Sequence, residues 1–166
     1  AKFKLECEIP DDLLIRISSS GEYSLLQKEL AAKIIVRDLS PQGFFSYYKN
    51  FGFSIPEGAI DALINLRLKD EFLNADLEAQ IRELTLTKDE IIAKLNSSVK
   101  ANFKYSLSDK QLNGSLDIID AKLKLEKIEP IFENINGKLE FSPSQLMWSG
   151  LSFKYLNAEY KTSGAL

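Results

Sequence analysis

Histidine is absent from this sequence of 166 residues, and cysteine, methionine and tryptophan occur once each. Without histidine, the chain lacks the commonest general base and the commonest metal ligand. The single cysteine, Cys7, excludes an internal disulfide and any metal site built from several cysteines. We therefore predict that the protein is not an enzyme and that it holds neither a cofactor nor a metal.

Long hydrophobic runs and a basic charge balance are also missing. No stretch of about 18 apolar residues occurs, so the sequence predicts no transmembrane helix. The net charge is −3 and the sequence pI is near 5.2, whereas nucleic-acid-binding domains carry a basic face, so we expect no nucleic-acid partner. The hydrophobic share of 45% is typical of a globular protein, and the length predicts a single domain over residues 1–166.

The clearest pattern in the sequence is a strict alternation over residues 73–82. Its apolar residues fall on odd positions and its polar residues on even positions, which in a strand separates them onto opposite faces. Residues 59–68 and 97–107 repeat this pattern. We predict that the apolar positions of these three strands line one continuous surface: Ile60, Ala62, Ile64, Leu66, Leu73, Ala75, Leu77, Ala79, Ile81, Val99, Ala101, Phe103 and Tyr105.

Further strands are predicted along the whole chain, about a dozen in all, separated by short polar turns. Residues 69–71 predict a hairpin turn, and we also expect turns at 18–21 and 56–58 and a connector at 127–134. The predicted fold is all-β. Its long antiparallel, strongly curved sheet would form either an apolar-lined groove or a sandwich.

One short helix is expected near residues 41–50. Ser40 can cap the first amide groups, Pro41 suits the first helical position, and Gly52 is a plausible stop. We expect the aromatic residues of this segment to close an open end of the β core.

A short phrase recurs in the second half of the sequence, as Asn113-Gly114-Ser115-Leu116, Asn136-Gly137-Lys138-Leu139 and Ser163-Gly164-Ala165-Leu166. Glycine within a strand permits a bulge or a close approach of another backbone. The unequal spacing of the phrase argues against a solenoid of fixed period. We expect a kink at each of these glycines, as a strongly curved sheet requires.

These phrases, together with residues 34–41 and the aromatic segment that follows, resemble the AsmA-like (AsmA/TamB/YhdP) family of Gram-negative bacteria. The resemblance extends from about Ala31 to Leu166. The chain also opens and closes within strand patterns, so we expect an internal segment of a longer protein.

The resemblance implies a location and a function. Proteins of this family are anchored in the inner membrane, extend through the periplasm as a β groove with an apolar lining, and are linked to phospholipid transport and outer-membrane assembly. The expected partners are phospholipid acyl chains and the adjacent β segments of the parent protein. The family has no catalytic motif to transfer.

Three other interpretations remain open at the level of sequence. The apolar face could pack against a second sheet as the dry core of a structural or protein-interaction sandwich. A transmembrane barrel also alternates, but here the polar positions are densely charged. An enzyme would need acidic groups such as Asp11-Asp12 or Asp117 with Asp120, and these lie at predicted turns, where aspartate commonly binds the backbone.

Overall fold

The computed structural model describes all residues except 10–14, 45–49, 51 and 127, and it is an all-β protein. Its ten strands are long, and the three central ones are the longest. The strands are β1 (Lys2–Ile9), β2 (Ile15–Ser24), β3 (Glu29–Leu39), β4 (Ser54–Lys69), β5 (Phe72–Lys88), β6 (Ile91–Ser106), β7 (Gln111–Leu125), β8 (Ile128–Ser142), β9 (Gln145–Tyr155) and β10 (Ala158–Ala165).

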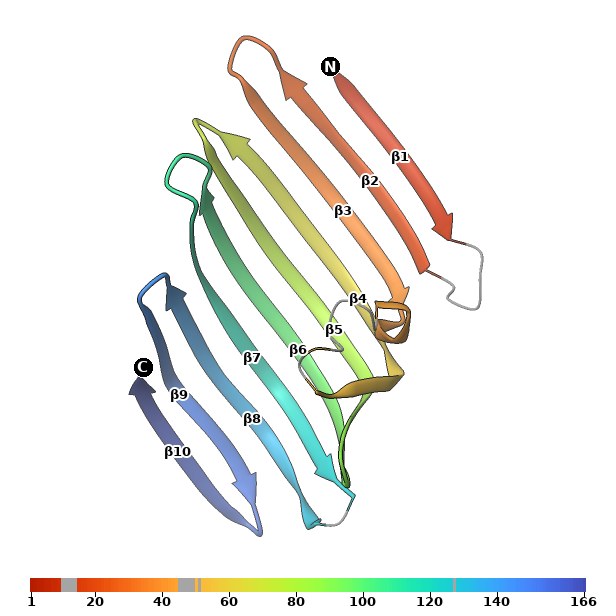
Figure 1. The fold of residues 1–166 in the computed structure, drawn as a ribbon, viewed down its shortest axis with the longest axis vertical. Coiled ribbons are helices and arrows are strands. Elements are labelled where there is room, and N and C mark those ends of the chain that lie inside the picture. Colours follow the sequence, from red (N-terminus) through yellow and green to blue (C-terminus); the bar gives the residue numbers. More distant parts are fainter. Residues whose placement is uncertain (10–14, 45–49, 51, 127) are drawn as a thin grey trace.

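All ten strands belong to one antiparallel sheet whose spatial order is the order of the chain (Figure 1). The sheet does not close into a barrel, so β1 and β10 form its two edges. The predicted all-β class and long antiparallel sheet are confirmed. The described residues make one continuous sheet, and among them no second sheet packs against its apolar side.

Two-residue turns connect β4 to β5, β5 to β6, β8 to β9 and β9 to β10. The predicted hairpin between β4 and β5 is confirmed, with Lys69 paired to Phe72 across the turn. Its central residues, Asp70 and Glu71, have φ of 48° and 67°. Positive φ at both central positions is the geometry of a type I′ turn, whose twist matches that of paired strands.

A line of bulges crosses the sheet from β3 to β10. At four of these bulges an extra residue enters an odd-numbered strand (β3, β5, β7 or β9), and its backbone N–H is bound by a polar side chain of the next strand. The N–H groups of Asp38, Glu83 and Asp120 donate to Asp61, Asn96 and Asn136, over 2.8–2.9 Å. All three donor residues have φ near +50°. Gly150 and Ser163 repeat the arrangement between β9 and β10, at 3.3 Å.

The predicted glycine kinks are therefore only partly right. The bulges at β7–β8 and β9–β10 do use Asn136 and Ser163, the polar residues of two recurring phrases. Gly114, in contrast, lies in regular pairing, directly opposite Phe103 and Phe141. A Cβ atom added to Gly114 would lie 2.7 Å from Cζ of Phe141, so this glycine makes room for an aromatic ring.

Three predicted interruptions are wrong, because they lie inside strands. Residues 18–21 continue β2 in full register with β1 and β3. Residues 56–58 belong to β4, where Gly58 with φ of 128° forms an irregularity in the pairing with β5. Apart from residue 127, the predicted connector at 127–134 belongs to β8, and the register shift between Leu123 and Leu125 accommodates it.

The predicted helix near 41–50 is not found in the described part of that segment. Pro41–Phe44 forms a single 3-10 turn, η1, in which Pro41 is buried. The predicted helix start at Ser40-Pro41 is therefore the start of a 3-10 turn and not of a longer helix. Residues 45–49, which carry most of the aromatic side chains of this segment, lie outside the described residues.

Candidate functional site

The strand register brings all thirteen predicted lining residues onto one side of the sheet, here called the apolar face. Ile64 of β4 lies directly opposite Leu77 of β5, which in turn lies opposite Ala101 of β6. Directly paired residues in an antiparallel sheet point to the same side. The alternation seen in the sequence therefore becomes a continuous apolar surface across these three strands.

The apolar face extends beyond the predicted residues into the flanking strands. On one side, Ile34 pairs with Ile64, and Val36 pairs with Ala62. On the other side, the face continues through residues that the site prediction left out, and alternation was again the signal that marks them: Leu116, Ile118, Leu139, Phe141, Leu146 and Trp148.

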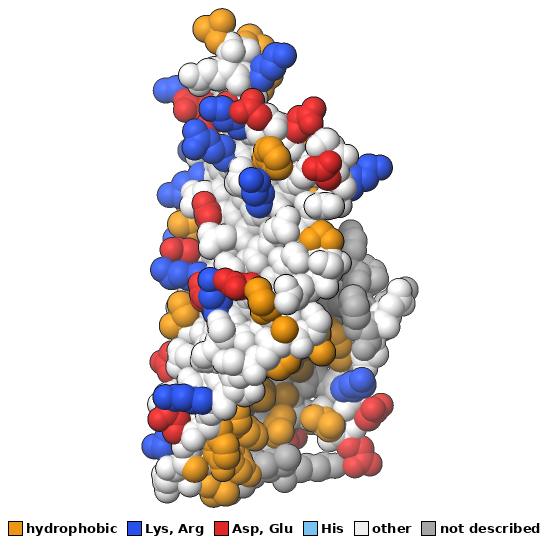
Figure 2. Space-filling model, turned by 90° about the vertical axis from the view of Figure 1, so that its left-hand side faces the viewer, with side chains coloured by type: hydrophobic (Ala, Val, Ile, Leu, Met, Phe, Trp, Pro, Cys, Tyr) orange, Lys and Arg blue, Asp and Glu red, His pale blue; other side chains and the backbone are white. Residues whose placement is uncertain are grey.

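This surface is only partly shielded from solvent. Of the thirteen lining residues, Ala101 is buried and the others are partly exposed. Among the described residues, no large side chain is less than 2% exposed. Figure 2, which views the molecule from the β10 side, shows hydrophobic side chains gathered in the hollow of its lower half. The apolar face thus retains surface that a ligand or another protein segment can cover.

An aromatic cluster that the sequence analysis did not identify lies across β8, β9 and β10. Phe132 stacks on Tyr155 with ring centroids 4.6 Å apart, and Phe153 stacks on Tyr160 at 5.1 Å. Phe132 and Phe153 also meet edge to face at 5.7 Å. The four rings form an apolar wall that runs to the edge of the sheet, where Tyr160 is 46% exposed.

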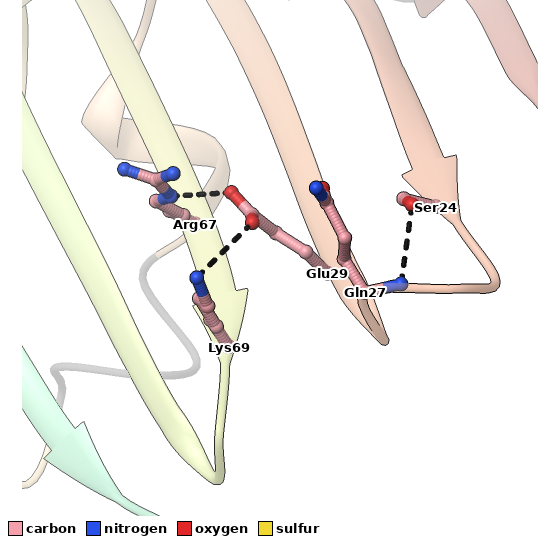
Figure 3. Close-up of polar contacts among 5 residues, drawn as sticks. All are labelled: Ser24, Gln27, Glu29, Arg67 and Lys69. Carbon is pink, nitrogen blue, oxygen red and sulfur yellow. Dashed lines mark hydrogen bonds and ion pairs between the residues drawn. The ribbon is translucent and has the colours of Figure 1, made fainter.

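The opposite side of the sheet, here called the polar face, carries ion pairs. Arg82 binds both Asp38 and Asp61, at 2.8 and 2.9 Å, next to the first bulge. Glu29 is bound by Arg67 and Lys69 (Figure 3), and the hydrogen bond from Arg67 holds the pKa of the Glu29 carboxyl below its ordinary value. A depression of about 1000 Å³ on this face is lined by charged and amide side chains, including those of Lys33 and Asn65.

The acidic residues considered for catalysis do not come together. Asp117 lies between Lys100 and Lys138 in regular pairing, and Asp120 is the extra residue of a bulge. Asp11 and Asp12 lie outside the described residues. In the described part of the chain, no group of three or more His, Cys, Asp or Glu side chains is placed to hold a metal ion.

Within the described residues, no helix has the length and apolar character needed to cross a membrane. Comparison of the chain with family models, with curated proteins and with solved structures gives no match.

Proposed function

We propose that this chain is a non-enzymatic section of a β groove that shelters phospholipid acyl chains. In this proposal it belongs to an AsmA-like protein anchored in the inner membrane, and it contributes to phospholipid transport through the periplasm and to outer-membrane assembly. The observation that carries the proposal is the apolar face, which continues across the open sheet and stays partly exposed.

The physical argument concerns the length and the chemistry of this face. Strands β4, β5 and β6 have 16, 17 and 16 residues. At about 3.4 Å per residue such strands are longer than an extended acyl tail of a phospholipid. Each CH₂ group transferred from water to this face contributes up to about 0.8 kcal/mol, so even partial cover retains a lipid.

The arrangement of charge supports the same function. The ion pairs of Lys100 with Glu78 and of Arg82 with Asp61 lie on the polar face. An acyl chain on the apolar face would therefore meet hydrocarbon side chains along β4, β5 and β6 without desolvating a charge.

The test is native mass spectrometry with lipid extraction on protein purified from a bacterial host without detergent. We expect phospholipid at a defined stoichiometry, lost in Ile64→Asp and Leu77→Asp while the far-ultraviolet β signal remains. Asn65→Asp, the neighbour on the polar face, is the matched control and should keep its lipid.

A second measurement avoids reliance on variants that fail to fold. A photo-crosslinking residue at Leu77 should form adducts with phospholipid, whereas the same residue at Glu78 should not. Well-folded protein that carries no lipid and gives no adduct at either position would contradict the proposal.

A further inference from the structure

The β2–β3 hairpin ends in an exposed pair of leucines. Leu25 and Leu26 are 78% and 99% exposed. This hairpin forms the upper end of the molecule along its longest axis, and hydrophobic side chains occupy that extreme end in the space-filling view (Figures 1 and 2). No side chain of the described residues shields Leu26, so the pair is presented outward from the sheet.

The turn that carries the leucines is fixed by local contacts. Ser24 pairs with Glu29 at the last rung of the hairpin. The N–H of Gln27 donates to Oγ of Ser24 over 3.3 Å (Figure 3), and Lys28 adopts φ of 49°. The leucines therefore project from a defined turn.

Charge around the tip is arranged so that the nearest acid is neutralised. Glu29 follows directly after the turn, and Arg67 and Lys69 of β4 bind its carboxylate. Lys28 extends from the turn itself. The acidic pair Asp70 and Glu71 belongs to the β4–β5 turn, which is set back from this tip in Figure 1.

We propose that the β2–β3 tip docks on a lipid bilayer, with Leu25 and Leu26 inserted at the interface and Lys28 at the headgroup phosphates. Two leucines offer far less than the roughly 800 Å² per partner of a stable protein interface. Insertion into a bilayer depends on the transferred apolar area and needs no complementary shape. Lysine beside an inserted apolar residue can extend its ammonium group to the headgroups.

One part of this inference rests on the proposed function. Strands β2 and β3 run from the tip into the sheet that bears the apolar face, and Ile34 of β3 lies in that face. Docking at the tip would hold the end of the groove against the bilayer, so that an acyl chain leaving the bilayer meets the apolar face.

The direct test uses the single cysteine of the sequence. In a Cys7→Ser background, Leu26→Cys is labelled with the environment-sensitive dye NBD and mixed with vesicles of phosphatidylethanolamine and phosphatidylglycerol. We expect a blue shift and quenching by lipids spin-labelled in the acyl chain. The control is the dye at Leu156→Cys, in the β9–β10 turn at the other end of the molecule, where 65% exposure is comparable. An unshifted dye at position 26, or an equal response at both positions, would overturn the proposal.

A binding measurement tests the same idea without a label. The Leu25→Ser/Leu26→Ser variant should lose at least about a hundredfold in vesicle affinity measured by co-sedimentation, because each leucine contributes at least about tenfold in partitioning and the two factors multiply. Leu156→Ser should bind like the wild type. Unchanged binding of the double variant would contradict docking by this tip, as would sedimentation velocity showing that the leucines join two copies of the chain.

The two proposals fail separately. The Leu25→Ser/Leu26→Ser variant should keep the phospholipid seen by native mass spectrometry, because it leaves the apolar face unchanged. Ile64→Asp should lose that lipid but still shift the dye at position 26.

Discussion

The backbone N–H of Glu83 donates to Oδ1 of Asn96 at 2.8 Å, and Nδ2 of Asn96 returns a hydrogen bond to the Glu83 carboxylate at 3.0 Å. This reciprocal pair holds the bulge between β5 and β6. We expect Asn96→Ala to lower the free energy of unfolding by about 1 kcal/mol, because it leaves the Glu83 N–H without its partner. Chemical denaturation measures the change. Asn102→Ala, in regular pairing on the same strand, removes only an exposed side-chain hydrogen bond to Asp76 and should cost less. Equal losses of unfolding free energy in the two variants would mean that the bulge contact stabilises the fold no more than an ordinary surface contact.

The backbone conformation of Glu83 gives a second prediction. In a strand valine usually gives a more stable protein than glycine, and at this position we expect the reverse. Glu83 has φ of +49°, which glycine tolerates and a β-branched residue does not. We expect Glu83→Gly to be more stable than Glu83→Val by about 1–2 kcal/mol. At Glu78, a regular exposed position of the same strand, valine should instead be more stable than glycine. If valine were more stable than glycine at position 83 as well, the bulge would not be retained in solution.

Close packing of an aromatic ring over Gly114 is the basis of a third prediction. A methyl group there would lie 2.7 Å from Cζ of Phe141 and 2.5 Å from the carbonyl oxygen of Asn102. Gly114→Ala should therefore cost about 1–3 kcal/mol of stability. Phe141→Leu should recover part of that loss in a double-mutant cycle, because it removes the ring but leaves the carbonyl group. Ser115→Ala is the control and should stay within about 0.5 kcal/mol of the wild type.

The ion pairs of Glu29 predict a defined response to pH. The hydrogen bond from Arg67 lowers the pKa of the Glu29 carboxyl from its ordinary value of 4.5, partial burial opposes this, and the charges of Arg67 and Lys69 reinforce it. Because the folded-state pKa is depressed, the contribution to stability is present above pH 4.5 and is lost as the pH falls through the lower, folded-state value. Carboxyl carbon NMR should give a midpoint below 4.5 that rises in Arg67→Gln. An identical midpoint in both proteins would show that the pair does not form in solution.

Strict alternation made the apolar face predictable from sequence. Residues such as Leu77 and Ile64 fall on the expected side because period two leaves no other arrangement in a strand. Turn chemistry was less informative, because Ser18 to Gly21 and Pro56 to Gly58 both favour turns locally. Pairing with neighbouring strands keeps the first segment extended and includes the second in β4 as an irregularity.

Other features of the structure had no signal in the local sequence that could predict them. Glu83 and Asp120 adopt positive φ although neither residue type requires it, because the opposite side chain binds their N–H groups. The aromatic wall of Phe132, Phe153, Tyr155 and Tyr160 depends on the register of three strands, which single-strand patterns do not fix.

The spatial order of the strands, identical to their order in the chain, has a consequence for how the protein folds. Every strand pairs only with its neighbours in sequence, so each new strand can add to an existing edge without waiting for a distant partner. Such local connectivity gives short loop closures and a low entropic barrier for an all-β chain. The sheet can therefore grow strand by strand as the chain emerges during synthesis. Hydrogen exchange should find its slowest amides in β4, β5 and β6, with protection falling away toward β1 and β10.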